Sequence, residues 1–312
     1  MVLFGIFFLN AFPQNINMEF PYLNGKTYDF IIFQGTGAKT IMKGTIPDDG
    51  KFTLIIPPEY FPYTGMSRWL ITGTAEGGGL DMLIPGHDFE VVCKEAEPND
   101  QNILYVQNDE IPELNTLYSE QQKILAKYEA MRTAKQVFSN EDPHYRIFEL
   151  KYQEQMKLYE AFQRELMSKD DYAAKFINIV NITSGAGTKL LHTEKDNAES
   201  INEYITGHLD WETLYTSGHW NGVINSWVSI HTKIFNDPKR FAVDFSKITG
   251  RIKDDKQYED LVKRVAGQLK GKDEFAKGII PVVVLSGKIR VYGDGLSRFV
   301  SGAQKQPAQT FD

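Results

Sequence analysis

Short apolar runs, separated by turns rich in glycine and proline, dominate the first third of the chain. Residues 28–33, 39–46 and 52–56 are β-branched or aromatic runs of strand length, and Asp49-Gly50 before the third run is a hairpin signal. The stretches "SRWLITGTA", "LDMLI" and "DFEVVC" continue this pattern to Cys93. Several short strands at this spacing predict an antiparallel β-sandwich or half-barrel over residues 18–96.

The period of the apolar positions becomes helical after the polar stretch "KEAEPNDQN". Asn108 or Asp109 can cap a helix that has Pro112 in its first turn, and apolar residues then recur at helical spacing up to Met131. A second helix, after "SNEDPH", carries on one face Phe148, Tyr152, Tyr159, Phe162 and Leu166. Two such helices with a short loop between them predict a long αα-hairpin. Further helices are expected at residues 171–182, 198–209, 221–235 and 257–269.

The end of the chain has the pattern of strands again. An apolar β-branched run, residues 282–285, follows Pro281, and the turn Ser286-Gly287-Lys288 leads to a second run at residues 289–292. This pattern predicts a short C-terminal β-hairpin. The expected fold class is therefore α+β, with a β-sandwich-like domain at residues 18–96, a helical domain at 106–271, and a hairpin with a polar tail at 272–312.

An apolar run at residues 2–9 has the length of a signal-peptide core and is too short to span a bilayer. We interpret residues 1–17 as an export signal; a buried first strand or a segment added for expression is the alternative. Export predicts a protein of the periplasm or cell envelope of a Gram-negative bacterium, without a transmembrane anchor once the signal is removed.

Composition and charge narrow the classes of partner. The 312 residues are 42% hydrophobic and 24% charged, which is ordinary for a globular protein. The formal net charge of −7 disfavours a nucleic-acid partner, because such partners are held by basic surfaces. We expect a protein or a small molecule as the partner.

The chain has one cysteine, Cys93, so it cannot form an internal disulfide, a CxxC pair or a multi-cysteine zinc site. Lys94 is adjacent, but neighbouring residues on a strand point to opposite faces and would not stabilise a thiolate. We interpret Cys93 as a small buried residue and keep it as a candidate redox residue.

The richest constellation is "LYTSGHWNGVINSWVSIH". Its apolar and aromatic residues share one helix face: Trp220, Ile224, Trp227, His231 and Ile234. His219 and His231 are twelve residues apart, whereas a two-histidine metal site needs a spacing of three or four. We interpret the stretch as a packed aromatic face with a half-buried histidine, and we expect no metal, cofactor or catalytic residue.

Two other kinds of motif have ordinary interpretations. "SGAGTKLL" and "GTGAKT" resemble phosphate loops but lack the Gly-Lys pair and the strand-to-helix context, so they are interpreted as loops. The acidic pairs at residues 48–49, 170–171 and 254–255 lie at turns or helix starts, where carboxylates cap backbone amides.

The order of the segments resembles one family. "YDFIIFQG", "DDGKFTLIIP" and "LDMLIPGHDFEVV" resemble the N-terminal domain of unknown function that precedes the thioredoxin-like domain of periplasmic bacterial thiol–disulfide oxidoreductases of the peroxiredoxin/thioredoxin family. "DDYAAKFI" and "LYTSGHWNGVINSW" resemble their helical linker. The resemblance covers residues 18–270.

That resemblance implies a thioredoxin fold with a CxxC, which this sequence lacks. Pro281 stands where the family has a cis-proline before a strand, and Gly287-Lys288-Ile289 resembles the turn of its last hairpin. Ten residue steps separate Gly271 from Pro281, whereas a βαβ unit needs roughly 30 residues. The catalytic domain is thus degenerate, truncated or frame-shifted, or the hairpin belongs to another fold.

Three functions follow from these observations. We favour a non-catalytic accessory or binding protein of the cell envelope, whose partner is a protein, a small molecule or a second copy paired at the edge of the hairpin. The first alternative is a thiol–disulfide oxidoreductase of redox homeostasis that uses Cys93. The second is a glycan- or lipid-binding module that uses the tryptophans at positions Trp69, Trp211, Trp220 and Trp227.

Overall fold

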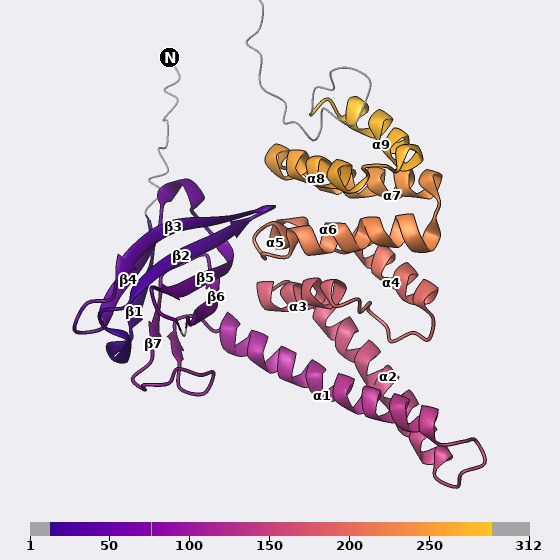
Figure 1. Ribbon diagram of the computed structural model, residues 1–312, viewed down its shortest axis with the longest axis horizontal. Helices are drawn as coiled ribbons and strands as arrows, with labels where there is room; N and C mark the ends of the chain where they lie inside the picture. Colours follow the sequence, from indigo (N-terminus) through magenta and orange to yellow (C-terminus); the bar gives the residue numbers. More distant parts are fainter. Residues whose placement is uncertain (1–12, 76, 289–312) are drawn as a thin grey trace, which may run out of the picture. The chain divides into compact units, whose positions relative to one another are not determined.

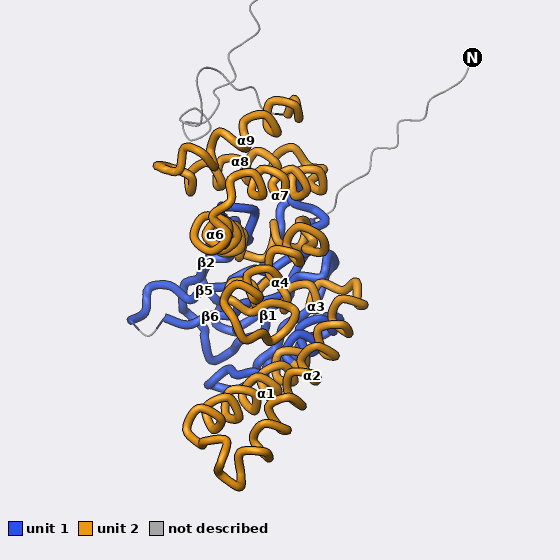
Figure 2. Tube along the Cα trace, turned by 90° about the vertical axis from the view of Figure 1, so that its right-hand side faces the viewer, with its two compact units in different colours: residues 1–115 blue, residues 116–312 orange. Residues whose placement is uncertain are grey.

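The computed structural model describes residues 13–75 and 77–288, and the chain divides into two compact units at Asn115 and Thr116 (Figures 1 and 2). Strands make up the first unit and helices the second, so the predicted α+β class, with antiparallel sheets followed by helices, is confirmed. Within the described ranges, no helix combines the length and apolar character needed to cross a bilayer.

The first unit contains two four-stranded sheets, with strand orders β4-β1-β7-β8 and β3-β2-β5-β6. The strands are β1 (Gln14–Glu19), β2 (Thr27–Gln34), β3 (Gly37–Thr45), β4 (Lys51–Ile56), β5 (Thr64–Thr72), β6 (Gly79–Pro85), β7 (Phe89–Val92) and β8 (Leu104–Val106). Pairing is antiparallel in both sheets except that β1 and β7 run parallel.

The two sheets pack through an aromatic cluster. Phe52 of β4 lies 5.0 Å from Tyr28 of β2 and 5.6 Å from Trp69 of β5, measured between ring centroids. Phe20, just after β1, lies 4.9 Å from the same indole. Apolar residues alternate along β1 and β2 with buried positions at every second residue, as expected for strands that cover one core face.

Three details of the β unit differ from the sequence-based predictions. Asp49-Gly50 does not close a hairpin, because β4 pairs with β1 in the other sheet rather than with β3. Gly50 has φ 71°, and a Cβ there would lie 2.4 Å from Pro21 Cα, so the turn that changes sheets requires glycine. β1 begins at Gln14 and Ile16 is fully buried, so the boundary predicted at residue 18 is too late.

The polar stretch "KEAEPNDQN" is also not the end of the β unit. It lies between β7 and β8, which pair with each other in the same sheet. The composition of the stretch is that of a surface loop, and nothing local distinguishes such a loop from a linker between domains.

The helical unit contains an αα-hairpin followed by a packed helical bundle (Figure 1). The helices are α1 (Glu110–Val137), α2 (Tyr145–Ser168), α3 (Tyr172–Thr183), α4 (Glu194–Gly207), α5 (Trp211–Tyr215), α6 (Trp220–Ser229), the π-helical segment η3 (Ile230–Phe235), α7 (Pro238–Arg251), α8 (Asp255–Gln268) and α9 (Asp273–Ser286). α1 begins at the end of the first unit. The predicted αα-hairpin is confirmed, with Tyr128 of α1 stacked on Tyr152 of α2.

Carboxylates start several of these helices. Asp171 Oδ1 accepts a hydrogen bond of 2.7 Å from Ala174 N, and Asp254 Oδ1 accepts bonds of 2.9 Å from the backbone of residues 256 and 257. The capping interpretation of these two acidic pairs is therefore confirmed. The same signal precedes α7, where Asp237 caps and Pro238 is the first residue, but the sequence-based prediction omitted this helix.

The C-terminal hairpin prediction is wrong over the described residues. The segment that includes Pro281 is helix α9, and residues 289–292, the predicted second strand, lie outside the described residues. Phe275, Ile279 and Val283 are buried at steps of four, which is the period of a helix face. The run of four apolar residues after Pro281 has the pattern of a buried strand, but two of its members, Val284 and Leu285, are exposed.

We expect Pro281→Ala to stabilise the helical unit by about 1–3 kcal/mol, because proline inside a helix removes a backbone hydrogen bond. Urea unfolding measures the change. Pro238→Ala is the matched control, since the first position of a helix tolerates proline and little change is expected. An unchanged or reduced stability of the Pro281 variant would favour the hairpin instead.

Candidate functional site

The candidate residues from the sequence lie in different environments. Cys93 follows β7 and is buried, with Sγ 3.5 Å from Asn102 Oδ1 and 3.7 Å from the carbonyl of Glu95. The prediction that this cysteine is a small buried residue is confirmed. Pro281 is an exposed residue of α9 and does not precede a strand, so its comparison with a redox-site proline is wrong.

The tryptophans proposed as a ligand-binding surface are all buried: Trp69, Trp211, Trp220 and Trp227. Their rings are therefore not exposed for stacking against a glycan or lipid at the surface. Trp220 and Trp227 of α6 form the packed aromatic face that the sequence predicted, and Trp220 makes an edge contact with Trp211 of α5 at 5.8 Å.

The two histidines of the constellation are not neighbours. His219 precedes α6, is half-buried, and lies 5.4 Å from the ring of Phe176; burial lowers its pKa. His231 lies at the other end, in η3. Across the described ranges, no three histidine, cysteine or acidic side chains come together in a way that could hold a metal ion.

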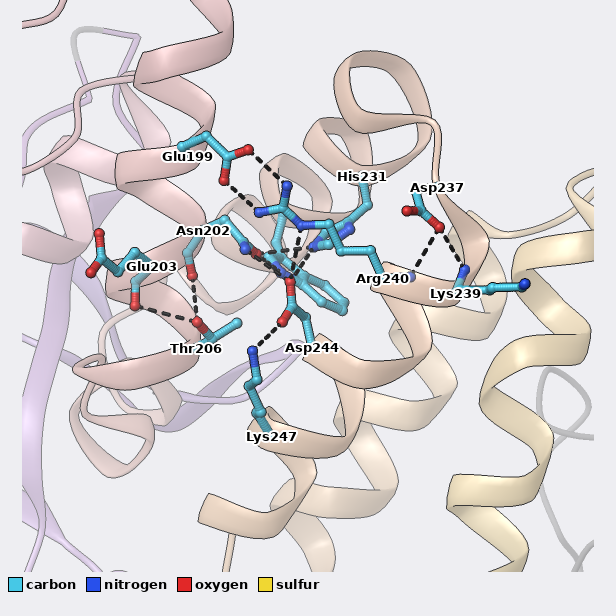
Figure 3. A network of polar contacts seen from close by, with 11 residues as sticks. Glu199, Asn202, Glu203, Thr206, His231, Asp237, Lys239, Arg240, Asp244 and Lys247 are labelled. Atoms are coloured by element: carbon cyan, nitrogen blue, oxygen red, sulfur yellow. Dashed lines mark hydrogen bonds and ion pairs between the residues drawn. The ribbon is translucent and has the colours of Figure 1, made fainter.

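His231 belongs to a buried cluster that we call the Asn202 network, made of Asn202 of α4, Trp227 of α6, His231 of η3 and Asp244 of α7 (Figure 3). Asn202 Oδ1 lies 2.9 Å from both Trp227 Nε1 and His231 Nε2, and Asn202 Nδ2 donates to Asp244 Oδ2 at 2.9 Å. The side-chain amide of Asn202 therefore links α4 with α6, η3 and α7.

The hydrogen bonds fix the protonation of the network. An indole N–H can only donate, so the atom that it meets on Asn202 is the oxygen. His231 Nε2 must then carry the proton that it gives to the same oxygen, which leaves Nδ1 unprotonated. That Nδ1 is buried and has no hydrogen-bond partner in the described part of the chain.

Aromatic rings surround His231 and keep it neutral. Its ring centroid lies 4.8 Å from that of Trp227, 5.1 Å from Phe235 and 5.2 Å from Phe241. Burial lowers the pKa of His231 to about 4, although the charge of Asp244 opposes this shift. The ring is thus a neutral donor at pH 7.

The carboxylate of Asp244 stays ionised despite its burial. Burial alone would raise the pKa of Asp244, but hydrogen bonds from Lys247, at 2.7 Å, and Asn202 outweigh it and lower the pKa. Arg240 Nε lies 3.6 Å from the same carboxylate, and its two terminal nitrogens bind Glu199 of α4 at 2.7 and 2.5 Å. The charges of the network are therefore balanced within the helical unit.

A pocket of about 550 Å³ lies against the same segments, and we call it the α3–α4–η3 pocket. It is formed by the end of α3 and its following turn, the first half of α4, and the side of α6 and η3. The lining residues are Ile182, Thr183, Ser184, Gly185, Glu194, Asn197, Ala198, Ile201, Ser226, Ser229, Ile230, Lys233 and Ile234.

The network and the pocket use adjacent residues of the same helices. Ile201 lines the pocket while Asn202 joins the network, and Ile230 lines the pocket while His231 joins the network. Asn197 closes another edge, since its side chain donates to the carbonyl of Gly185 at 2.6 Å and ties α4 to the turn after α3. The buried hydrogen bonds of Asn202 and the exposed one of Asn197 therefore hold walls of the pocket in place.

A second pocket, near the start of α5, is smaller, about 210 Å³. Arg251 lines it but donates to the carbonyls of Ile205 and Leu209. Asp210 lines it as well, but it caps α5 and pairs with Lys175. Arg251 and Asp210 are thus engaged within the protein, and the larger α3–α4–η3 pocket is the stronger candidate site.

The sequence located part of this site. Trp227 and His231 were selected from their helical spacing, but their partners Asn202 and Asp244 lie on other helices and have no motif that reveals them. The pocket residues Ser226, Ser229 and Lys233 follow helical spacing on the opposite face of the same segment, and that polar face was a signal that the prediction did not use.

Comparisons with known proteins identify no family. No family model matches the chain, and neither a curated protein nor a solved structure matches it. The resemblance to thioredoxin-like oxidoreductases therefore stays a prediction from short sequence motifs.

Acidification is expected to destabilise the helical unit through His231. Its pKa is about 4 in the folded protein against an ordinary value of 6.5, so the unfolded chain binds the proton more readily. Stability from this residue is complete above pH 6.5 and is lost as the pH falls to 4, by roughly 3 kcal/mol in total. Chemical denaturation at several pH values measures this loss.

His231→Phe keeps an aromatic ring but removes the titration, so we expect its stability to fall less steeply between pH 6.5 and 4. His208→Gln, at an exposed position after α4, is the matched control and should follow the wild type. Parallel curves for the His231 variant and the wild type would contradict the assignment.

Proposed function

We propose that this protein is a non-catalytic binding protein and that its helical unit holds a small organic ligand in the α3–α4–η3 pocket. The observation that carries the proposal is the pocket itself. Its volume of about 550 Å³ lies in the range of small-molecule sites, roughly 300–1,000 Å³. Its walls come from helices that the buried hydrogen bonds of Asn202 hold together, as a preformed site requires.

The character of the lining supports ligand binding. Four isoleucines give the pocket apolar surface, and its polar groups come from three serines, a threonine, an asparagine, a lysine and a glutamate. Apolar surface combined with polar groups that fix orientation is typical of sites that bind a small molecule.

The chemistry around the pocket favours binding over catalysis. A nucleophile needs a base within hydrogen-bond reach, and neither Ser226 nor Ser229 has a hydrogen bond to a histidine or carboxylate among the described residues. His231 is neutral and donates into the buried network, with aromatic rings around it.

The alternatives from the sequence receive less support. Cys93 is buried, which is the wrong setting for a reactive thiol in an oxidoreductase. The buried tryptophans weaken the glycan or lipid module that would use them. We also propose a location in the cell envelope. Its support is the apolar run at residues 2–9, which lies outside the described residues.

Binding in the pocket can be tested by NMR with isoleucine methyl groups labelled. The protein is titrated with pooled amino acids, short peptides, fatty acids, sugars and nucleosides. We expect one pool to shift the methyl signals of Ile182, Ile201, Ile230 and Ile234, because these side chains line the pocket. Isoleucines of the β unit, such as Ile32, should not move.

Ser229→Phe fills the pocket and should abolish these shifts, whereas Ser246→Phe, at an exposed position on α7, should leave them unchanged. Thermal unfolding of both variants shows whether each retains its fold. The proposal is wrong if no pool shifts the pocket methyls, or if a folded Ser229 variant binds as the wild type does.

A further inference from the structure

The α3–α4–η3 pocket is lined by two charged residues of opposite sign. Lys233 of η3 and Glu194 of α4 both line the pocket, and neither forms an ion pair with any residue in the described part of the chain. Arg240 and Lys247 of α7 differ in this respect, since Arg240 pairs with Glu199 and Lys247 with Asp244. The pocket therefore contains one cation and one anion that do not reach each other.

Two hydroxyls accompany the lysine. Ser226, Ser229 and Lys233 follow one another at steps of three and four, so they lie on one face of α6 and η3. Long side chains on a helix lean toward its N-terminus, which brings the ammonium of Lys233 toward Ser229. Neither hydroxyl makes a side-chain hydrogen bond within the described ranges, so this wall offers an ammonium and two hydroxyl donors to an anion.

The wall contributed by α4 has the opposite charge. Glu194 is the first residue of α4 and exposes its carboxylate at the pocket. A carboxylate without a cationic partner accepts hydrogen bonds from an ammonium group. Between these polar groups lie the side chains of Ile182, Ile201, Ile230 and Ile234.

The apolar lining selects the shape of the ligand. The lining contains no aromatic side chain, so nothing in it would stack on a flat ring. β-Branched aliphatic walls instead make close contacts with an aliphatic chain.

We infer that the ligand is a small aliphatic zwitterion, namely an aliphatic amino acid or short peptide, with its carboxylate at Lys233 and the two serines and its ammonium at Glu194. This inference rests on the proposed function, because it requires that the pocket binds a small molecule. It adds the chemical class of that molecule and the role of each charged residue.

The contributions of the ligand's ammonium and carboxylate groups to binding can be separated with leucyl-leucine, free leucine and two blocked peptides. N-acetyl-leucyl-leucine lacks the ammonium, and leucyl-leucine amide lacks the carboxylate. We expect leucyl-leucine or free leucine to bind, and each blocked peptide to bind about tenfold or more weakly than leucyl-leucine, since a hydrogen-bonded charge contributes at least one factor of ten. Calorimetric titration and the pocket methyl signals measure the affinities.

Two variants test which residue of the pocket binds each charged group of the peptide. Lys233→Gln should weaken the binding of leucyl-leucine and of the acetylated peptide, but not the binding of the amide. Glu194→Gln should weaken the binding of leucyl-leucine and of the amide, but not the binding of the acetylated peptide. Lys239→Gln and Glu203→Gln are the matched controls, since both residues are exposed and lie outside the pocket lining. Unfolding curves confirm that each variant is folded.

The outcomes separate the two proposals. If other small molecules bind in the pocket but the zwitterions do not, or if blocked and free peptides bind equally, the inference fails and the proposed function stands. If no compound of any class shifts the pocket methyls, the proposed function itself fails.

Discussion

The side-chain amide of Asn202 is the interaction on which the arrangement of the helical unit depends. Its oxygen accepts from Trp227 and His231 and its nitrogen donates to Asp244, so a single group connects α4, α6, η3 and α7. Loss of the amide would leave buried polar groups without partners, at about 1–3 kcal/mol for each. Because the neighbouring residues Ile201 and Ile230 line the α3–α4–η3 pocket, the same hydrogen bonds that hold the interior also hold the binding surface.

The sequence predicted correctly those features that depend on residues close together in the chain. The β-branched runs of β2 to β4, the aromatic face of α2 and the capping carboxylates Asp171 and Asp254 were all recognised correctly. The pairing of β4 with β1 was missed because strand partners are chosen by the packing of two sheets, not by the turn at Gly50. Helix α9 was missed because Pro281 and a β-branched run outweighed the four-residue period of Phe275, Ile279 and Val283.

The candidate site shows the limit of sequence reasoning more clearly. His231 could be selected from its spacing to Trp227, which placed both residues on one packed helix face. Its partner Asn202 lies 29 residues away on another helix, and isolated asparagines carry no signal of burial. The pocket depends on how α3, α4 and η3 converge, so only the fold could bring Glu194 and Lys233 to one cavity.

Asn202 is central to the site because it holds the proton of the neutral His231 on Nε2 and links the helices that form the walls of the pocket. The most direct measurement is a long-range ¹H–¹⁵N NMR spectrum of the histidine rings at pH 7. We expect His231 to have a protonated Nε2 and an unprotonated Nδ1, and Asn202→Leu to change both this pattern and the methyl signals of Ile201 and Ile230. A proton on Nδ1 of His231, or a doubly protonated ring, would contradict it.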